Sequence, residues 1–341
     1  MTAAVLHGKE DVRVEEVPLP AAGPGEVRVR IEAALTCGTD VKVYKRGYHA
    51  RMITPPAIFG HEFAGTIDEV GEGVEGWRLG DRVCAANSAP CGECGWCQSG
   101  REELCEDLLF LNGAYAQYIT VPGRIVQRNL LKVPQQVSMS HAALAEPLAC
   151  VLNGLRKLPV SAGDNVAVIG LGPIGLLFVY LSSLAGAKVA AAGRGGQRLR
   201  AAAELGASTI LDAAVEPDLV ASIRNATGCR ANRVFECVGT STAWETAIGA
   251  CGRGGAVNLF GGCERGTKLT LDAHRLHYDE ITVIGSFHHT PALFREALEM
   301  IYAHERDLCA IVNAEAPLRR LPEVLALAAS GGGAIKTLII P

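Results

Sequence analysis

The 341-residue sequence predicts an α/β protein in two parts, a β-rich part followed by a doubly wound parallel sheet. Up to about residue 150, short alternating apolar segments are separated by turns rich in Gly and Pro, which is typical of many short strands. Beyond that point, strand-length apolar runs alternate with helix-length segments, which predicts parallel strands joined by right-handed crossovers. A glycine-rich turn joins the first of these strands to the first helix.

Individual elements follow from the same patterns. In the β-rich part, strands are expected at Glu26–Ile31, Ala64–Val70 and Tyr115–Val121. In the second part, strands are expected at Asn165–Gly170, Lys188–Ala192, Thr209–Leu211, Arg233–Val238, Ala256–Phe260 and Ile281–Gly285. Helices are expected from Pro173 to about Ala185, at Gln197–Leu205 and at Ala292–Ala303, and a last strand at Ala334–Ile340.

Composition and charge narrow the class of protein. Hydrophobic residues make up 49% of the chain and charged residues 20%, as in packed globular proteins. The net charge of −4, with no run of Lys or Arg, argues against a nucleic-acid partner. The N-terminus lacks the layout of a signal peptide, and glycines and a proline interrupt the longest apolar stretch, residues 166–187. We therefore expect a cytoplasmic protein with no membrane partner.

Four of the 12 cysteines form a cluster with C-x2-C-x2-C-x7-C spacing: Cys91, Cys94, Cys97 and Cys105. Four thiolates at this spacing predict a closed tetrahedral zinc site. An iron–sulfur cluster is the alternative, but the last gap does not match the usual cluster spacings. Six further cysteines are expected to be small buried residues: Cys84, Cys150, Cys229, Cys251, Cys263 and Cys309.

Three more residues have the side chains of an open zinc site: Cys37 in C-G-T-D, His61 in G-H-E, and Glu146 in A-E-P-L. Three protein ligands would leave a fourth position for water or a substrate oxygen. Each residue taken singly has a structural alternative as a buried thiol, a core histidine or a helix-start carboxylate. The presence of the four-cysteine cluster favours the metal interpretation for all three.

Five motifs stand in this order along the chain: C-G-T-D, G-H-E-x2-G-x5-G-x2-V, the four-cysteine cluster, A-E-P-L and G-L-G-P-I-G. Over essentially the whole chain they resemble the zinc-containing medium-chain dehydrogenases. A-E-P-L is similar to the branch that contains sorbitol and other polyol dehydrogenases and threonine dehydrogenase. The resemblance implies a GroES-like catalytic domain at residues 1–150, completed by residues 287–341, and a Rossmann nucleotide-binding domain at residues 151–286.

The resemblance also implies roles for residues of the metal site. Cys37, His61 and Glu146 would ligate a catalytic zinc, which makes two zinc ions per chain with the four-cysteine site. Glu62 is similar to a residue beside the metal that enters its shell during ligand exchange. Asp40 would accept a hydrogen bond from the distal nitrogen of His61 and so fix its tautomer. Thr39 would hydrogen-bond the substrate hydroxyl and carry its proton outward.

The glycine-rich turn has the G-x-G-x-x-G pattern of a dinucleotide-binding loop: Gly170, Gly172, Pro173, Ile174 and Gly175. It follows a predicted strand and opens a helix, so a pyrophosphate would lie against the helix N-terminus. NAD enzymes place an acidic residue about 20 residues on, to bind the ribose 2′-hydroxyl. Here Gly193-Arg194 stands at that position, and residues 176–203 contain no acid. Arg194, with Arg198 as a second donor, favours NADP over NAD.

Other cofactor contacts are implied by the resemblance alone. Segments that would line the nicotinamide pocket are Cys237-Val238, Phe260-Gly261 and Ser286-Phe287. Lys336 is similar to a basic residue that reaches the pyrophosphate. The family suggests a homotetramer or homodimer in which the Ile281–Gly285 edge strand pairs across subunits.

The predicted function is zinc-dependent hydride transfer between NAD(P) and a secondary alcohol of a polyol-like substrate. A threonine-3-dehydrogenase-like or aminocyclitol dehydrogenase is the nearest alternative. A non-catalytic nucleotide-binding homologue and a zinc-free quinone reductase are disfavoured by the intact metal residues. The sequence leaves open whether Tyr44, Tyr48 and His49 face the substrate or an exposed loop, and it favours a polar loop for His288-His289.

Overall fold

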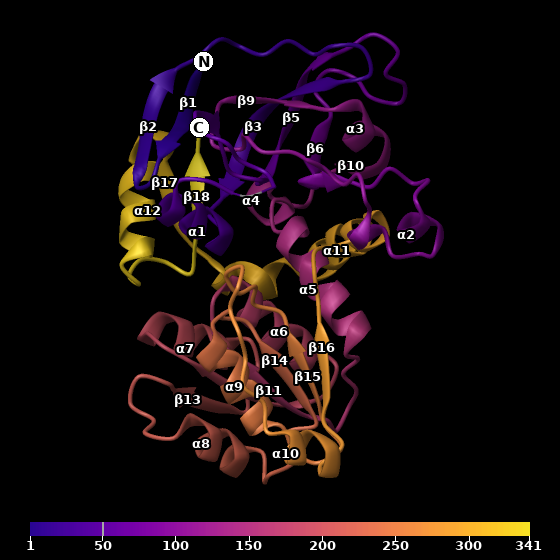
Figure 1. Cartoon of the computed structure of the whole chain (residues 1–341). Coiled ribbons are helices and arrows are strands. Elements are labelled where there is room, and N and C mark those ends of the chain that lie inside the picture. Colours follow the sequence, from indigo (N-terminus) through magenta and orange to yellow (C-terminus); the bar gives the residue numbers. More distant parts are fainter. Residues whose placement is uncertain (50) are drawn as a thin grey trace. The chain divides into compact units, whose positions relative to one another are not determined.

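The computed structural model describes residues 1–49 and 51–341 (Figure 1). The chain divides into two compact units, Met1–Ala149 with His289–Pro341 and Cys150–His288. The first unit therefore takes both ends of the chain, and the second is inserted between them. The passage from the first unit to the second lies within helix α5 (Ala145–Lys157).

The first unit is built on mostly antiparallel sheet, in which only β17 and β18 pair in parallel among the described strands (Figure 1). Its largest sheet has the order β10-β6-β5-β3-β18-β17, with β9 also paired to β3. A second sheet has the order β2-β1-β4, and β7 pairs with β8. The strands are β1 (Thr2–Gly8), β2 (Asp11–Glu16), β3 (Val27–Leu35), β4 (Ala57–Ile58), β5 (Glu62–Val70), β6 (Arg82–Ala85), β7 (Ser88–Ala89), β8 (Leu109–Phe110), β9 (Tyr118–Val121), β10 (Leu130–Lys132), β17 (Val312–Pro317) and β18 (Lys336–Ile340).

Burial alternates along the first five residues of β3, as expected of a strand that packs one face on the core. The core behind it includes Phe59 and Tyr115, whose rings meet edge to face at 5.1 Å. Short helices complete the unit: α1 (Gly38–Arg46), α2 (Gly95–Gln98), α3 (Gly123–Asn129), α4 (Met139–Ala142), α11 (Pro291–His304) and α12 (Leu321–Ala329), with 3-10 turns at Glu102–Leu104, Glu305–Ala310 and Leu318–Arg320.

The second unit contains one six-stranded sheet of order β13-β12-β11-β14-β15-β16, and every pair in it is parallel. The order runs outward in both directions from β11, as in a doubly wound sheet. The strands are β11 (Asn165–Ile169), β12 (Lys188–Gly193), β13 (Thr209–Asp212), β14 (Arg233–Glu236), β15 (Ala256–Leu259) and β16 (Thr282–Gly285). The helices are α6 (Pro173–Leu184), α7 (Gly196–Glu204), α8 (Leu219–Ala226), α9 (Ser241–Ala250) and α10 (Ala273–Tyr278).

The predicted fold class is confirmed. The predicted strands of the parallel sheet match β11 to β16 to within two residues at either end. Helices α1, α8, α9 and α10 and strand β17 are among the elements that were not predicted. Among the cysteines expected to be buried, Cys84 and Cys251 are, but Cys229 and Cys309 are exposed, so that prediction is wrong for these two. Among the described residues, no helix has the length and apolarity needed to cross a membrane.

The first turn of α6 generates a prediction about stability. A Cβ at Gly175 would collide with the carbonyl oxygen of Gly170, whereas a Cβ at Gly172 would meet nothing within 4 Å. Gly175→Ala should therefore lower the free energy of unfolding by about 1–3 kcal/mol, although alanine favours helices. Gly172→Ala, the matched control, should change it by less than about 0.5 kcal/mol. Denaturant unfolding of both variants checks this, and equal effects would contradict the close approach.

Candidate metal centres and cofactor pocket

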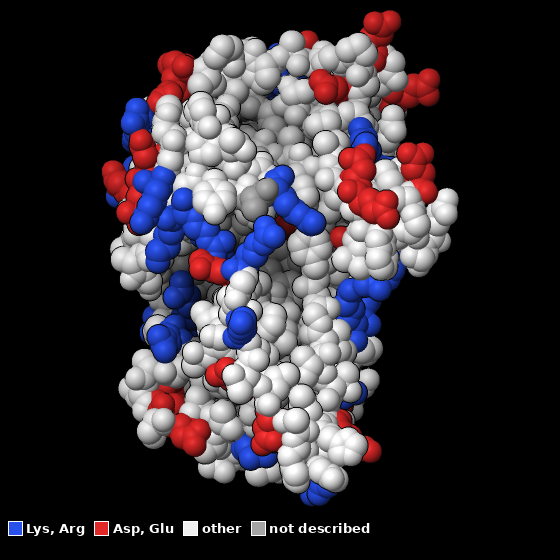
Figure 2. Space-filling model, viewed as in Figure 1, with Lys and Arg blue, Asp and Glu red and all other residues white. Residues whose placement is uncertain are grey.

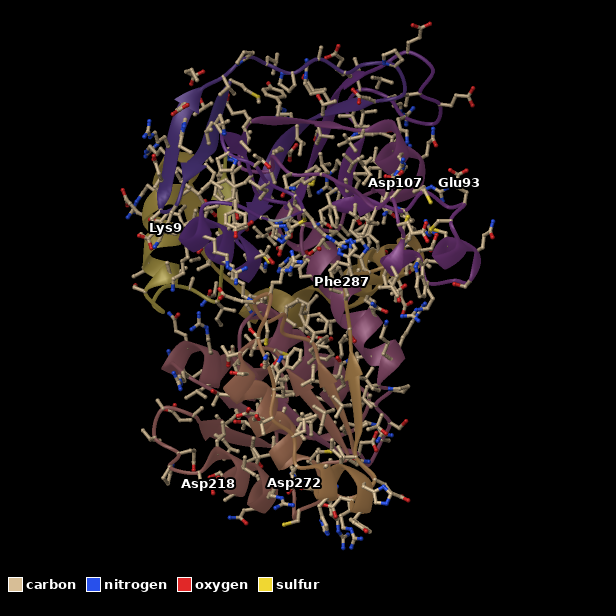
Figure 3. The ribbon with its side chains drawn as sticks, viewed as in Figure 1. Lys9, Glu93, Asp107, Asp218, Asp272 and Phe287 are labelled. Carbon is tan, nitrogen blue, oxygen red and sulfur yellow. The ribbon has the colours of Figure 1, made fainter. Side chains whose placement is uncertain are left out.

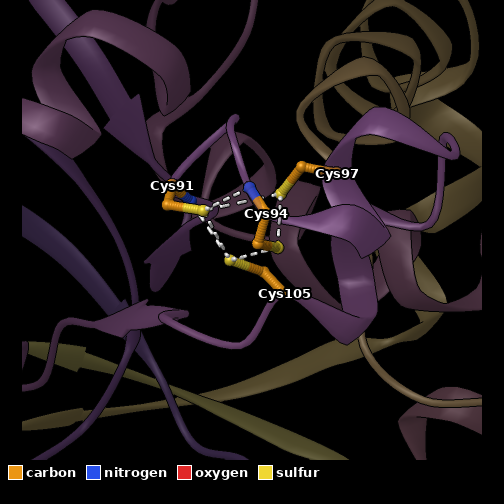
Figure 4. A group of neighbouring side chains, drawn as sticks. All are labelled: Cys91, Cys94, Cys97 and Cys105. Carbon is orange, nitrogen blue, oxygen red and sulfur yellow. Dashed lines mark hydrogen bonds between the residues drawn. The ribbon is translucent and has the colours of Figure 1, made fainter.

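The four clustered cysteines converge as predicted (Figure 4). Their sulfur atoms lie 3.4 Å (Cys91–Cys105), 3.6 Å (Cys94–Cys97), and 3.9 Å (Cys91–Cys97 and Cys94–Cys105) apart. Four sulfurs at zinc–thiolate bond lengths in a tetrahedron would be about 3.8 Å apart. The donor set and its spacing therefore fit a zinc ion with no open position.

The backbone of this segment favours thiolates. The N–H groups of Cys91 and Cys94 each donate to a cysteine sulfur, over 3.2 Å and 3.4 Å. Backbone N–H groups at Glu106 and Cys97 also lower the pKa of the Cys94 thiol to about 6. A lowered pKa makes that sulfur a better metal ligand at neutral pH.

A second group brings together Cys37, His61 and Glu62, whose ligand atoms all lie within 4.8 Å of one another. Strand pairing explains their proximity. Glu62 opens β5 directly opposite Leu35 at the end of β3, and Cys37 follows two residues later as the N-cap of α1. The chain turn after β3 therefore carries the thiol to the imidazole. Cysteine, histidine and glutamate are all zinc ligands, so this donor set fits the metal.

Asp40 contacts two members of this group, Cys37 and His61, and is fully buried. Its Oδ2 accepts hydrogen bonds from the Cys37 backbone N–H at 2.9 Å and the Tyr115 hydroxyl at 2.5 Å. Its Oδ1 lies 3.2 Å from Nδ1 of His61, within ion-pair distance but short of regular hydrogen-bond geometry. Burial opposes protonation of His61, yet the negative charges of Asp40 and Cys37 together outweigh it and raise the pKa of His61 well above its usual value.

Glu146 does not belong to this three-residue group. It is 7% exposed, and its carboxylate lies 4.0 Å from Nε2 of His289. His289 is itself 2% exposed and also lies 3.4 Å from Oδ1 of Asn87. Burial lowers the pKa of His289 to about 4, so the ring is neutral at neutral pH.

His289 is thus a candidate site residue that the sequence analysis assigned to a polar loop. A signal for it was present. Thr290 directly follows it and caps α11, with Pro291 in the first turn. A Thr-Pro helix start fixes the chain immediately after the histidine and holds it at a buried helix end.

The second unit contains a cavity of about 500 Å³ at the carboxyl ends of β11, β12 and β14. Seven predicted cofactor residues line it: Gly170, Gly172, Gly193, Arg194, Arg198, Cys237 and Val238. Three polar residues of the lining were not predicted from the sequence: Thr240, Thr242 and Thr246. Thr240 is the N-cap of α9, and its place directly after Cys237-Val238-Gly239 was the available signal.

The other predicted cofactor residues are not among those that line this cavity. Pro173, Ile174 and Gly175 form the first turn of α6. The Gly261 carbonyl accepts a hydrogen bond from Trp244, and the Ser286 hydroxyl accepts one from Asn258. Phe260 packs edge to face against Phe178, and Phe287 is 44% exposed (Figure 3).

Positive charge borders the cavity. Figure 2 shows Lys and Arg side chains in the region of α7, the helix that contains Arg198. Nε of Arg198 is buried and has no hydrogen-bond partner among the described residues. On the neighbouring strand, the residue opposite Gly193 is the acidic residue Asp212. Its carboxylate accepts a hydrogen bond from the backbone N–H of Ala214. A buried donor without a partner fits an anionic group of a bound ligand.

The comparisons with known proteins agree on one family. Residues 23–135 match the family model described as alcohol dehydrogenase GroES-like domain, and residues 173–303 match zinc-binding dehydrogenase. The chain is 32% identical to a sorbitol dehydrogenase of Bombyx mori, over 99% of this chain and 97% of the relative. It is 31% identical to an L-threonine 3-dehydrogenase of Bacillus subtilis, over 96% and 94%.

The chain belongs to the zinc-containing medium-chain alcohol dehydrogenases. A solved structure agrees, that of a protein of Sinorhizobium meliloti 1021 described as a zinc-binding dehydrogenase bound to NADP. It has a TM-score of 0.88 and 30% identity, with coverage of 100% of this chain and 99% of that one.

The predicted family branch and enzyme class are therefore confirmed. This dehydrogenase is a zinc-dependent oxidoreductase of the polyol type that uses a nicotinamide cofactor and a small-molecule alcohol substrate. Hydride transfer to such a cofactor needs the substrate hydroxyl to lose its proton, since a neutral alcohol is a poor hydride donor.

In this dehydrogenase Lys336 has a partner that the sequence analysis did not foresee. Its ammonium group is 1% exposed and donates to the carboxylate of Glu62 and, over 2.8 Å, to the carbonyl of Thr36. Burial lowers the pKa of Lys336, but the negative charges of Glu62, Cys37 and Asp40 together outweigh burial and raise it. The predicted contact of Lys336 with a pyrophosphate stays a prediction, and the contact seen is with the metal-site carboxylate.

This pair generates a prediction. Lys336→Met should leave the Glu62 charge buried without its cation and lower the free energy of unfolding by about 3–5 kcal/mol. The double variant Lys336→Met, Glu62→Gln should recover most of that loss because no uncompensated charge remains. Arg320→Met, which breaks an exposed pair with Glu323, is the control and should cost less than about 1 kcal/mol. A double variant no more stable than the single one would argue against coupling.

Proposed function

We propose that Cys37, His61 and Glu146 hold the catalytic zinc and that Cys91, Cys94, Cys97 and Cys105 hold a second, structural one. The observation that carries the proposal is the convergence of Cys37, His61 and Glu62 above the buried Asp40. Glu146 is assigned on its burial and on the motif that contains it. A zinc ion with three protein ligands acts as a Lewis acid and lowers the pKa of the substrate hydroxyl.

Residues around the proposed metal ligands transfer the substrate proton and orient the His61 ring. Thr39 lies half-buried two residues after Cys37, and its hydroxyl can accept the proton of the substrate alcohol and pass it outward. Asp40 orients the His61 ring through Nδ1 and leaves the other nitrogen for the metal. Glu62 lies beside the proposed zinc ligands, and its carboxylate forms an ion pair with Lys336. This is the position of a residue that enters the coordination shell of the zinc during ligand exchange.

Metal analysis tests the assignment of the two sites. Wild-type enzyme should contain two zinc ions per chain. Cys37→Ser should lose one zinc and fall in kcat/KM by about 10³-fold or more, since the lost interaction acts on the reaction, and its unfolding temperature should fall less than that of Cys94→Ser. Cys94→Ser should also lose one zinc but lower the unfolding temperature markedly.

Cys309→Ser is the control, because Cys309 is exposed and should leave zinc content and activity unchanged. Full turnover and two zinc ions in Cys37→Ser would overturn the catalytic assignment. A single zinc in the wild type would instead favour a non-catalytic nucleotide-binding homologue. Threonine and aminocyclitols, assayed beside neutral polyols, discriminate the alternative substrates.

We also propose that residues 151–286 bind the nucleotide, that residues 1–150 with 287–341 carry the catalysis, and that NADP is preferred over NAD. The cofactor preference is supported by Arg194 and Arg198 in the cavity lining and by the partnerless Nε of Arg198. A 2′-phosphate would accept charge-assisted hydrogen bonds from both side chains. A homotetramer or homodimer in the cytoplasm is part of the same proposal. It is supported by the exposed residues of the edge strand β16.

The cofactor preference has a direct kinetic test. Arg194→Ala should lower kcat/KM for NADP by about 10- to 100-fold, because a charge-assisted contact to the 2′-phosphate is lost. The value for NAD should change by less than about twofold. Arg200→Ala, which alters an exposed arginine of α7 outside the cavity lining, is the matched control. A strong NAD preference in the wild type would refute the assignment.

A further inference from the structure

We propose that the substrate of this enzyme carries an anionic end group, a carboxylate or a phosphate, and that Arg51 and His49 bind it. The inference rests on the proposed function, because it places this anion close to the reacting centre at Cys37 and His61. It narrows the substrate class from neutral polyols to polyhydroxylated anions.

The first observation is a local excess of positive charge next to the metal group. The segment between Asp40 and Glu62 contains no acidic residue, but it carries four basic ones: Lys42, Lys45, Arg46 and Arg51. Part of it is α1, which begins immediately after Cys37. Figure 2 shows Lys and Arg side chains gathered over α1. The basic residues therefore begin in the helix that follows the proposed zinc ligand Cys37 and continue beyond the end of that helix.

The second observation is the state of His49. Nδ1 of its ring accepts a hydrogen bond from the backbone N–H of Arg51 at 3.2 Å. That bond fixes the neutral tautomer with its proton on Nε2. Within the described part of the chain, Nε2 has no partner, so it offers a hydrogen-bond donor to a ligand. The strand-like pairing of His49 with Ile53 fixes the backbone of this donor.

Electrostatics link this donor to the metal group. Partial burial lowers the pKa of His49, and the positive charges of His61, Arg46 and Arg51 lower it further. Arg46 and Arg51 act on the ring as cations, and the interaction with His61 places His49 near the proposed metal group. Two arginines beside a neutral donor attract an anion and repel a cation.

The third observation is that the guanidinium group of Arg51 is exposed and makes no hydrogen bond or ion pair with the described residues. Several other arginines of this unit are paired within the protein. Arg28 pairs with Asp68 and Glu69, and Arg82 donates to two backbone carbonyls. The planar fork of Arg51 remains available, and it matches the two oxygens of a carboxylate or phosphate.

The proposed metal centre would not cancel this charge. The thiolate of Cys37 and the carboxylate of Glu146 together offset a divalent ion, and Lys336 offsets Glu62. The carboxylate of Asp40 is fully buried and already receives two hydrogen bonds. The guanidinium group of Arg51, exposed and without a partner among the described residues, is therefore left to act on a ligand.

The test compares ligands with one carbon skeleton: sorbitol, gluconate and sorbitol 6-phosphate. For the zinc- and NADP-loaded enzyme, kcat/KM is measured by the change in NADPH absorbance. Binding to the enzyme loaded with NADPH, which cannot oxidise the ligand, is measured by calorimetry. At least one of the two anions should exceed sorbitol about tenfold in both readouts, and added salt should reduce this advantage. The preferred anion identifies the end group.

Variants identify the residues. Arg51→Gln should remove about 10- to 100-fold of the anion's affinity and kcat/KM and leave sorbitol unchanged. Arg51→Lys should retain part of the anion's affinity and kcat/KM, because lysine keeps the positive charge but lacks the planar fork. His49→Gln, which keeps a donor, should bind the anion better than His49→Phe. Arg320→Gln, which alters an exposed arginine already paired with Glu323, is the control.

The outcomes separate this inference from the proposed function. Sorbitol equal to or better than both anions, or equal losses for all three ligands in Arg51→Gln, would overturn the inference while leaving the dehydrogenase assignment in place. Absence of turnover with every ligand would count against the proposed function. In that case the calorimetric difference between wild type and Arg51→Gln still decides whether an anion binds here.

Discussion

The candidate active site depends on one buried carboxylate. Asp40 is fully buried and receives a backbone N–H from Cys37 and the hydroxyl of Tyr115, while its second oxygen faces His61. Because a buried charge is tolerated only when it is well partnered, these three groups are held around it. The same carboxylate closes the first turn of α1. It therefore fixes both the start of a helix and the direction of a metal-ligand ring.

Sheet topology supplies the remaining positions. The antiparallel pair of β3 and β5 sets Leu35 opposite Glu62, and β18 pairs with the same end of β3 at Leu338. Residues 300 positions apart in the sequence, Thr36 and Lys336, thus meet over 2.8 Å. The C-terminal strand completes the site, because without it the Glu62 carboxylate would be buried without a cation. The chain must therefore return to the first unit at its C-terminal end, because that segment supplies the cation that pairs with Glu62.

The sequence predicted those parts of the molecule whose chemistry is local. Cys91 to Cys105 lie in one short segment, and a thiol at each position has few structural uses other than a shared metal, so the cluster could be inferred from spacing. The strands of the parallel sheet were recognisable because short apolar runs bounded by glycine are typical of buried strands. Lys336 and His289 could not be placed, because their partners are remote in sequence and polar side chains give no periodic signal. Helices α8 and α10 have only 8 and 6 residues, so each is too short for a helical period to be recognised in the sequence.

Buried polar atoms without protein partners indicate where this molecule gives up stability for binding. Several such atoms occur in each unit within the described residues, and two of them, Oε1 of Glu62 and Nε of Arg198, border a proposed ligand site. Each costs about 1–3 kcal/mol in the absence of a ligand, since water is removed and nothing replaces it. One is an acceptor beside a set of metal ligands, and the other is a donor at the rim of a cavity lined by a glycine turn. A cation at the first and an anion at the second would satisfy both, so the metal and the cofactor should stabilise the units that bind them.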